Sequence, residues 1–165
     1  MGMVLLKGNE TSREVIYLAY GLEEGLRKFY SMSAELAIDP KIVSILTKLA
    51  DIEVKHKQRL FDVYLTIDPT TVDMEALENN VASELVEGGF DLDKLLEQSR
   101  KTFKTAARVL DFAMTLEAQA MDLYMRYAQR SEDPAVKNLF LDMANEEKSH
   151  LKSLGDLLDK YIDFA

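Results

Sequence analysis

The chain of 165 residues contains no cysteine at all. This absence excludes disulfides, thiol nucleophiles, iron–sulfur ligation and zinc–thiolate sites together, so any metal must be held by Glu, Asp or His. Proline and glycine are scarce, with three and seven residues, whereas 47% of the residues are apolar and 30% are charged. This balance is typical of a soluble helical protein. The length predicts a single domain over residues 1–165.

Positive charge is also in short supply. The 20 Lys and Arg residues face 29 Asp and Glu residues, which gives a formal net charge of −9. Nucleic acids and anionic membranes are bound by clustered Lys and Arg, so we expect neither as a partner, and cations are the more natural ligands. The first twelve residues hold one Lys and a short apolar stretch broken by Gly8. They predict neither a signal peptide nor a membrane span, and a cytoplasmic location is the expectation.

Apolar residues recur at spacings of three and four through 11–37, 41–65, 102–130 and 135–162, which predicts four helices. Thr11 and Ser12 suit the first helix start. Asp39-Pro40 and Asp133-Pro134 each place a capping Asp before a Pro in the first turn. The short turns predict two antiparallel hairpins, at about 11–65 and 102–162, joined by a long, partly helical crossover connection at about 66–101.

The two predicted hairpins are copies of each other. With an offset of 94 residues, 13 of the 48 positions in 15–62 are identical to those in 109–156. Amphipathic patterning alone explains matched Leu and Ala, but not matched Glu, Tyr and His. A hairpin with one apolar stripe cannot bury it alone, so we expect the copies to pack face to face. The predicted fold class is an all-α four-helix bundle.

Each of the two histidines lies in the repeat with a Glu three residues before it and another Glu 33 residues before it. On a helix, positions i and i+3 are about 60° apart and about 4.5 Å along the axis, so each Glu-x-x-His pair can point at one spot. Ferritin-like di-iron and di-manganese bundles hold their metals with this pattern, together with one Glu from each of the other two helices. The predicted metal ligands are Glu23, Glu53, His56, Glu117, Glu147 and His150.

Four carboxylates would neutralise two divalent ions. Carboxylate oxygens and imidazole nitrogens suit iron or manganese, and affinity alone does not exclude zinc. The alternative interpretation is that these residues are ordinary surface or core groups. It explains either Glu-x-x-His pair alone better than it explains six residues in register across a duplication.

Other polar residues carry weaker predictions. Tyr30 and Tyr124 each follow a predicted ligand by seven residues, which is two helical turns. Their phenols either hydrogen-bond a ligand carboxylate across the bundle or simply pack in the core. Glu24 and Glu146 are rotated by about 100° from adjacent ligands, and we expect both to face solvent.

The segments "AYGLEEGLRKFY", "LADIEVKH", "AMTLEAQAMDLY" and "MANEEKSH" resemble the rubrerythrin family of ferritin-like di-iron proteins. The resemblance covers roughly 12–64 and 106–160. It implies an oxidoreductase with two iron ions that cycle between ferrous and ferric states and reduce peroxide or oxygen. The resemblance also implies a role in oxidative stress. Residue by residue, it assigns the same six metal ligands.

Two departures from the family pattern qualify this resemblance. Full-length rubrerythrins carry a cysteine-rich rubredoxin domain that supplies electrons, whereas this chain has no cysteine. An external electron-donor protein is therefore implied. Ala120 stands where these proteins commonly carry an extra glutamate, so a non-catalytic metal-binding, sensing or iron-handling module is the alternative. The long connector also allows a homodimer, possibly with swapped hairpins, as relatives form.

Overall fold

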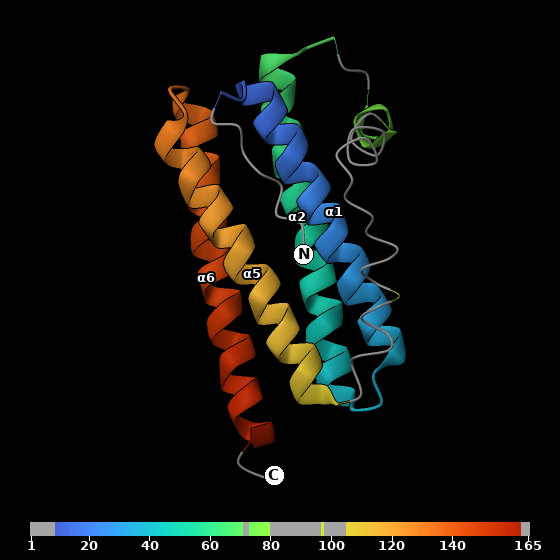
Figure 1. Ribbon diagram of the computed structural model, residues 1–165. Helices are drawn as coiled ribbons and strands as arrows, with labels where there is room; N and C mark the ends of the chain where they lie inside the picture. Colours follow the sequence, from blue (N-terminus) through green and yellow to red (C-terminus); the bar gives the residue numbers. More distant parts are fainter. Residues whose placement is uncertain (1–8, 71–72, 80–96, 98–104, 163–165) are drawn as a thin grey trace.

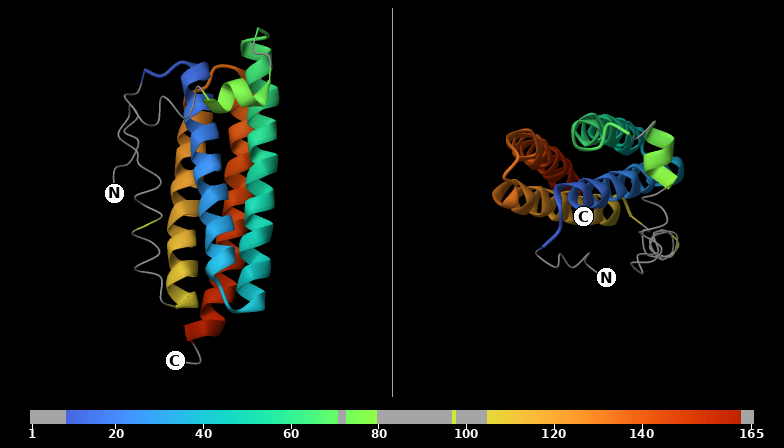
Figure 2. Two further views of the ribbon diagram at one scale, coloured as in Figure 1. Left: turned by 90° about the vertical axis from the view of Figure 1, so that its right-hand side faces the viewer. Right: turned by 90° about the horizontal axis from the view of Figure 1, so that it is seen from above.

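The computed structural model describes residues 9–70, 73–79, 97 and 105–162. Four long helices form a bundle: α1 (Ser12–Leu36), α2 (Pro40–Ile67), α5 (Ala106–Arg130) and α6 (Pro134–Ile162). No residue within the described ranges is in a strand. Figures 1 and 2 show α1 beside α2 and α5 beside α6, with all four helices running along one common axis. The predicted all-α, ferritin-like bundle of two hairpins is confirmed.

The helix starts follow the predicted capping residues. Thr11 accepts a hydrogen bond from the Glu14 backbone, and the Glu14 carboxylate accepts one from the Thr11 backbone, forming a capping box. Asp39 caps α2 through the Lys41 N–H, with Pro40 at the first helical position. Helix α5 begins at Ala106, after its cap Thr105. This is later than the predicted 102, and residues 102–104 lie outside the described part.

The crossover connection is described only in part. Residues 73–79 include a helical segment at 74–79. This segment is attached to the first hairpin, because Leu77 is fully buried and Glu78 accepts hydrogen bonds from Tyr20 and Lys57. The predicted helical character of the connector is therefore seen at 74–79 and at residue 97. The rest of the connector prediction lies outside the described residues.

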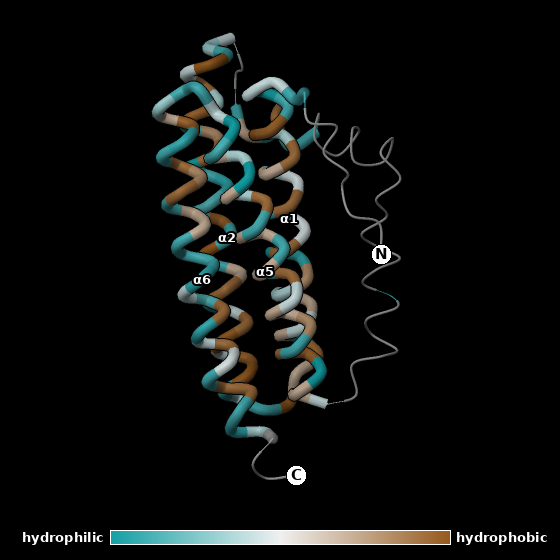
Figure 3. Tube along the Cα trace, turned by 60° about the vertical axis from the view of Figure 1, so that its left-hand side comes forward, coloured by the Kyte–Doolittle hydropathy of each residue, from teal (hydrophilic) through white to brown (hydrophobic). Residues whose placement is uncertain are grey.

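The core lies between the two hairpins and is apolar toward both ends of the bundle. Polar and apolar stretches alternate along every helix (Figure 3), as expected for helices that bury one face. Aromatic pairs connect the layers: Phe29 lies 5.1 Å from Phe112 across α1 and α5, and Tyr124 stacks on Phe140 at 5.7 Å, ring centre to ring centre. None of the described helices is long and apolar enough to cross a membrane.

Substitution of a core leucine should report on this packing. Leu46 is 0% exposed, whereas Leu141 is 37% exposed. We expect Leu46→Ala to lower the free energy of unfolding by about 2–5 kcal/mol, because it removes buried methylenes and leaves a cavity. Leu141→Ala is the matched control and should cost much less. Urea titration followed by circular dichroism measures both, and equal losses would contradict the packing described here.

Candidate metal centre

The structure brings all six predicted ligands to the middle of the bundle. Helices α1 and α5 each supply one glutamate, and α2 and α6 each supply a Glu-x-x-His pair, whose spacing places both side chains on the same helical face. Ligand atoms of two overlapping groups lie within 4.8 Å of one another: Glu23, Glu53, His56 and Glu147 in one group, and Glu53, Glu117, Glu147 and His150 in the other. Glu53 and Glu147 belong to both groups.

These side chains are buried. The four glutamates and His56 are 0% exposed, and the side chain of His150 is 12% exposed. The part of the alternative interpretation in which the glutamates are solvated surface residues is therefore wrong. Burial of like charges at one place is unfavourable unless cations or protons compensate them.

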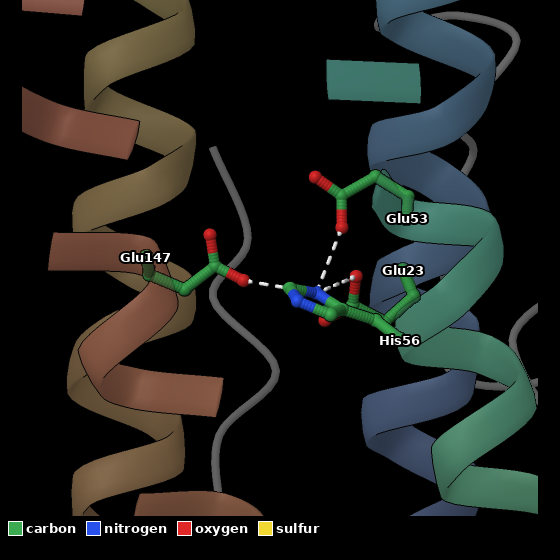
Figure 4. A group of neighbouring side chains, drawn as sticks. All are labelled: Glu23, Glu53, His56 and Glu147. Atoms are coloured by element: carbon green, nitrogen blue, oxygen red, sulfur yellow. Dashed lines mark hydrogen bonds and ion pairs between the residues drawn. The ribbon is translucent and has the colours of Figure 1, made fainter. Parts of the chain in front are cut away.

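Both imidazoles present Nδ1 to the carboxylates. His56 Nδ1 lies 3.2 Å from Glu23 Oε2, 3.1 Å from Glu53 Oε2 and 3.2 Å from Glu147 Oε1. Figure 4 shows these three acids converging on His56, with Glu147 reaching in from the opposite hairpin. His150 Nδ1 lies 2.8 Å from Glu147 Oε2 and 3.4 Å from a Glu117 oxygen. The two rings are stacked, with 6.0 Å between their centres.

The oxygens of the two shared glutamates fit a metal better than they fit hydrogen bonding. Both carboxylate oxygens of Glu53 and Oε1 of Glu147 are buried and lack a hydrogen-bond partner in the described part of the chain. Glu53 Oε2 and Glu147 Oε1 lie close to His56 Nδ1, but without the geometry of a hydrogen bond. Buried carboxylate oxygens without donors are costly. Bound cations would remove this cost, and a set of carboxylates with imidazoles suits iron or manganese.

Two tyrosines hold the remaining glutamates from across the bundle. Tyr30 on α1 donates a hydrogen bond to Glu117 Oε1, and Tyr124 on α5 donates one to Glu23 Oε1. Both tyrosines are fully buried. Of the two alternatives that the sequence leaves open, the structure shows the hydrogen bond. Each phenol occupies one oxygen of its glutamate and leaves the other oxygen facing the histidine.

Comparison with known proteins agrees with this geometry. A protein-family model described as Rubrerythrin matches residues 108–163. The chain carries a rubrerythrin-like domain. The match covers the second hairpin with Glu117, Glu147 and His150, and the internal repeat extends the same pattern to the first hairpin. Neither the curated proteins nor the solved structures contain a match to the chain.

Glu24 and Glu146, which were expected to face solvent, are only partly exposed and also pair with charged residues. The side chain of Glu146 is 44% exposed, and its Oε2 lies 2.8 Å from His56 Nε2. The side chain of Glu24 is 23% exposed, and it accepts hydrogen bonds from Lys57 and Arg27. A rotation of about 100° takes a side chain to the edge of the seam between two helices, where it can reach both water and the facing helix. The charged residues on the facing helices are the signal that sequence analysis missed.

Most of the titratable groups in the cluster have raised pKa values. Burial raises the pKa of Glu53 and of Glu117 well above the usual range. Burial alone would lower the pKa of His150, but hydrogen bonds to Glu117 and Glu147 outweigh it and raise the pKa to about 10. Burial would also lower the pKa of His56, but the neighbouring carboxylates of Glu147, Glu23 and Glu53 outweigh burial and raise it. Protons on these groups would therefore compensate most of the repulsion when no cation is present. Glu147 differs, because Glu117, His150 and His56 outweigh its burial and lower its pKa.

These shifts predict that the metal-free protein becomes less stable as pH rises. A group whose folded pKa exceeds its unfolded pKa stabilises the fold below the unfolded value, and this contribution is lost as pH rises through the folded value. For His150 the window runs from 6.5 to about 10, and for Glu53 it begins at 4.5. We expect the melting temperature of chelator-treated protein to fall between pH 6 and pH 9.

The matched control is the double variant Glu53→Gln with Glu117→Gln. It removes two groups with raised pKa values and should flatten this dependence. Differential scanning calorimetry on both proteins tests the prediction. A melting temperature that rises with pH across this range in the parent chain would contradict it.

Proposed function

We propose that this chain binds two metal ions, with iron as the physiological pair, and carries out iron-dependent redox chemistry. The reaction is reduction of peroxide or oxygen, or ferrous oxidation, with an external electron donor. The single observation that carries the proposal is the burial of donor-free carboxylate oxygens on Glu53 and Glu147, the two residues common to both ligand groups. The rubrerythrin-like match supports iron as the metal.

Each residue then has a defined role. Glu23 and His56 would hold one ion, Glu117 and His150 would hold the other, and Glu53 and Glu147 would bind both. Iron bound here would supply electrons for the reduction of the small oxidant. The phenols of Tyr30 and Tyr124 keep the outer glutamates in one orientation. The surrounding helices exclude water from the four glutamates, so electrostatic interactions between groups at the centre are strong.

Electrons must reach this centre from outside the chain. The sequence has no cysteine with which to build a rubredoxin-like iron site, so the proposal includes a separate electron-donor protein. It also includes a homodimer as the assembly and the cytoplasm as the location. In the structure, both hairpins of one chain complete the bundle, so swapping is not required for the six side chains to meet. Light scattering on the purified protein measures the assembly state, and the mass of two chains is the expected result.

One observation favours a non-catalytic alternative. Ala120 is fully buried on α5, one turn after Glu117. It offers no carboxylate at the position where the family resemblance implies an additional glutamate. A module that binds iron, manganese or zinc for sensing or delivery would need only the six side chains. Metal binding without peroxide-dependent turnover would select this second function.

Anaerobic loading with Fe(II) followed by peroxide tests the proposal. We expect two Fe(II) per chain and stoichiometric oxidation on addition of peroxide, monitored by a ferrous chelator and by optical absorption. Glu53→Gln should reduce both the iron content and the oxidation by at least about tenfold, because it removes a charged ligand common to both ions. Asp122→Asn is the matched control, since Asp122 is 60% exposed and pairs with Arg126.

The outcomes separate the two functions. Two bound ions without oxidation, with several reductants and oxidants tried, would replace the redox proposal by the binding module. A parent chain that binds no Fe(II), Mn(II) or Zn(II) would refute both. Equal iron oxidation in the parent and Glu53→Gln would show that the chemistry takes place elsewhere.

A further inference from the structure

The two halves of the centre are matched in their six ligands but not in the residues beside them. The offset of 94 residues that aligns the ligands also aligns Ile52 with Glu146 and Arg59 with Ser153. The charged pair of Arg59 and Glu146 therefore has one member in each half. The aligned positions in the other halves hold Ser153 and Ile52, which carry no charge. The two histidines have different surroundings for this reason.

At the His56 end, an ion pair bridges helices α2 and α6. Arg59 on α2 donates a hydrogen bond from Nη1 to Glu146 Oε1 on α6, and its Nη2 lies 3.8 Å from Asp142 Oδ2. The other oxygen of Glu146 lies 2.8 Å from His56 Nε2. The imidazole beneath this pair is 0% exposed. Both oxygens of Glu146 are thus engaged, one by Arg59 and the other by His56.

The His150 end lacks this arrangement. Ile52 and Ser153 carry no charge, and within the described ranges every hydrogen bond and ion pair of His150 uses Nδ1. The side chain is also 12% exposed, whereas that of His56 is fully covered. Solvent therefore reaches one imidazole of the centre but not the other.

The Glu146 contact determines which nitrogen of His56 can bind a metal. A carboxylate at Nε2 favours the proton on Nε2, because the carboxylate can only accept. When a cation replaces the proton on Nδ1, Nε2 keeps its proton for Glu146, and the lone pair is on Nδ1, the atom that faces Glu23, Glu53 and Glu147. A carboxylate partner on the outer nitrogen also fixes the ring orientation and makes the inner nitrogen a stronger ligand. No described carboxylate does this for His150.

We propose that Glu146, held by Arg59, is a positioning residue that makes the two metal positions inequivalent. The position at His56 binds its ion more tightly and fills first. The position at His150 binds more weakly and exchanges its ion with solvent. This inference rests on the proposed function, since it assumes that the six side chains hold two ions.

Stepwise binding of Mn(II) tests the inference without any turnover. Isothermal titration calorimetry, with electron paramagnetic resonance to count free Mn(II), should resolve two dissociation constants per parent chain. Glu146→Ala should weaken the tighter constant by about 10- to 100-fold and leave the weaker one unchanged. Glu146→Gln keeps an acceptor for His56 but loses the charge, and it should restore part of the affinity.

A gain-of-function variant provides the second measurement. Ile52→Glu combined with Ser153→Arg builds the missing pair at the His150 end, and it should tighten the weaker constant by about tenfold. The control is Asp156→Ala on α6, which removes a 62% exposed carboxylate paired with Lys152 and should change neither constant. Circular dichroism melts of the metal-free variants verify that each one folds.

Failure of this inference is distinguishable from failure of the proposed function. Two Mn(II) bound with equal constants in the parent, or two constants that Glu146→Ala leaves unchanged, would overturn the role of Glu146 while the two-metal centre stands. A parent chain that binds no Mn(II), Fe(II) or Zn(II) would overturn the centre itself and this inference with it.

Discussion

Four carboxylates meet in the dry middle of the bundle, and the rest of the structure depends on how their mutual repulsion is compensated. If the residues at this level were apolar, the two hairpins would pack together without any bound cation or proton. Instead, each hairpin brings two acids and one imidazole to the seam. Because the effective dielectric inside a protein is low, like charges at this separation oppose docking of the hairpins strongly. Protons or cations must lie among them, so occupancy of the centre and stability of the bundle are linked.

Neither hairpin can form the centre alone, because each one orients a glutamate of the other. Tyr30 of the first hairpin holds Glu117 of the second, and Tyr124 of the second holds Glu23 of the first. His56 likewise has Glu147 of the other half at its Nδ1. Every outer glutamate therefore takes its orientation from the opposite copy. The centre forms only when both halves dock, which couples assembly of the fold to assembly of the site.

The sequence was sufficient for those features that follow from helical periodicity. The spacing of Glu53 and His56, the helix start at Thr11 and Ser12 and the Asp39-Pro40 turn all rest on interactions within a few residues, and the structure agrees with each.

Features that depend on the meeting of distant segments could not be read in this way. The partner of Tyr30 is 87 residues away. Lys57 is 6% exposed, and its Nζ pairs with Glu78 of the connector, 21 residues away. The pairing of Glu146 with Arg59 was missed because the angle of Glu146 from the bundle axis says nothing about the facing helix.

The two halves differ in the outer residues and agree in the six predicted ligands, and the geometry explains why. A change in Glu53 or Glu147 would disturb both ligand groups at once, since each group contains both residues. A change in Arg59 or Glu146 would disturb the His56 end, where both residues lie. The duplicated protein can therefore vary the two ends independently while the interior stays fixed. Arg59 and Glu146 cover the His56 end, and the His150 end stays open to solvent. A symmetric set of ligands has in this way acquired a covered end and an accessible one.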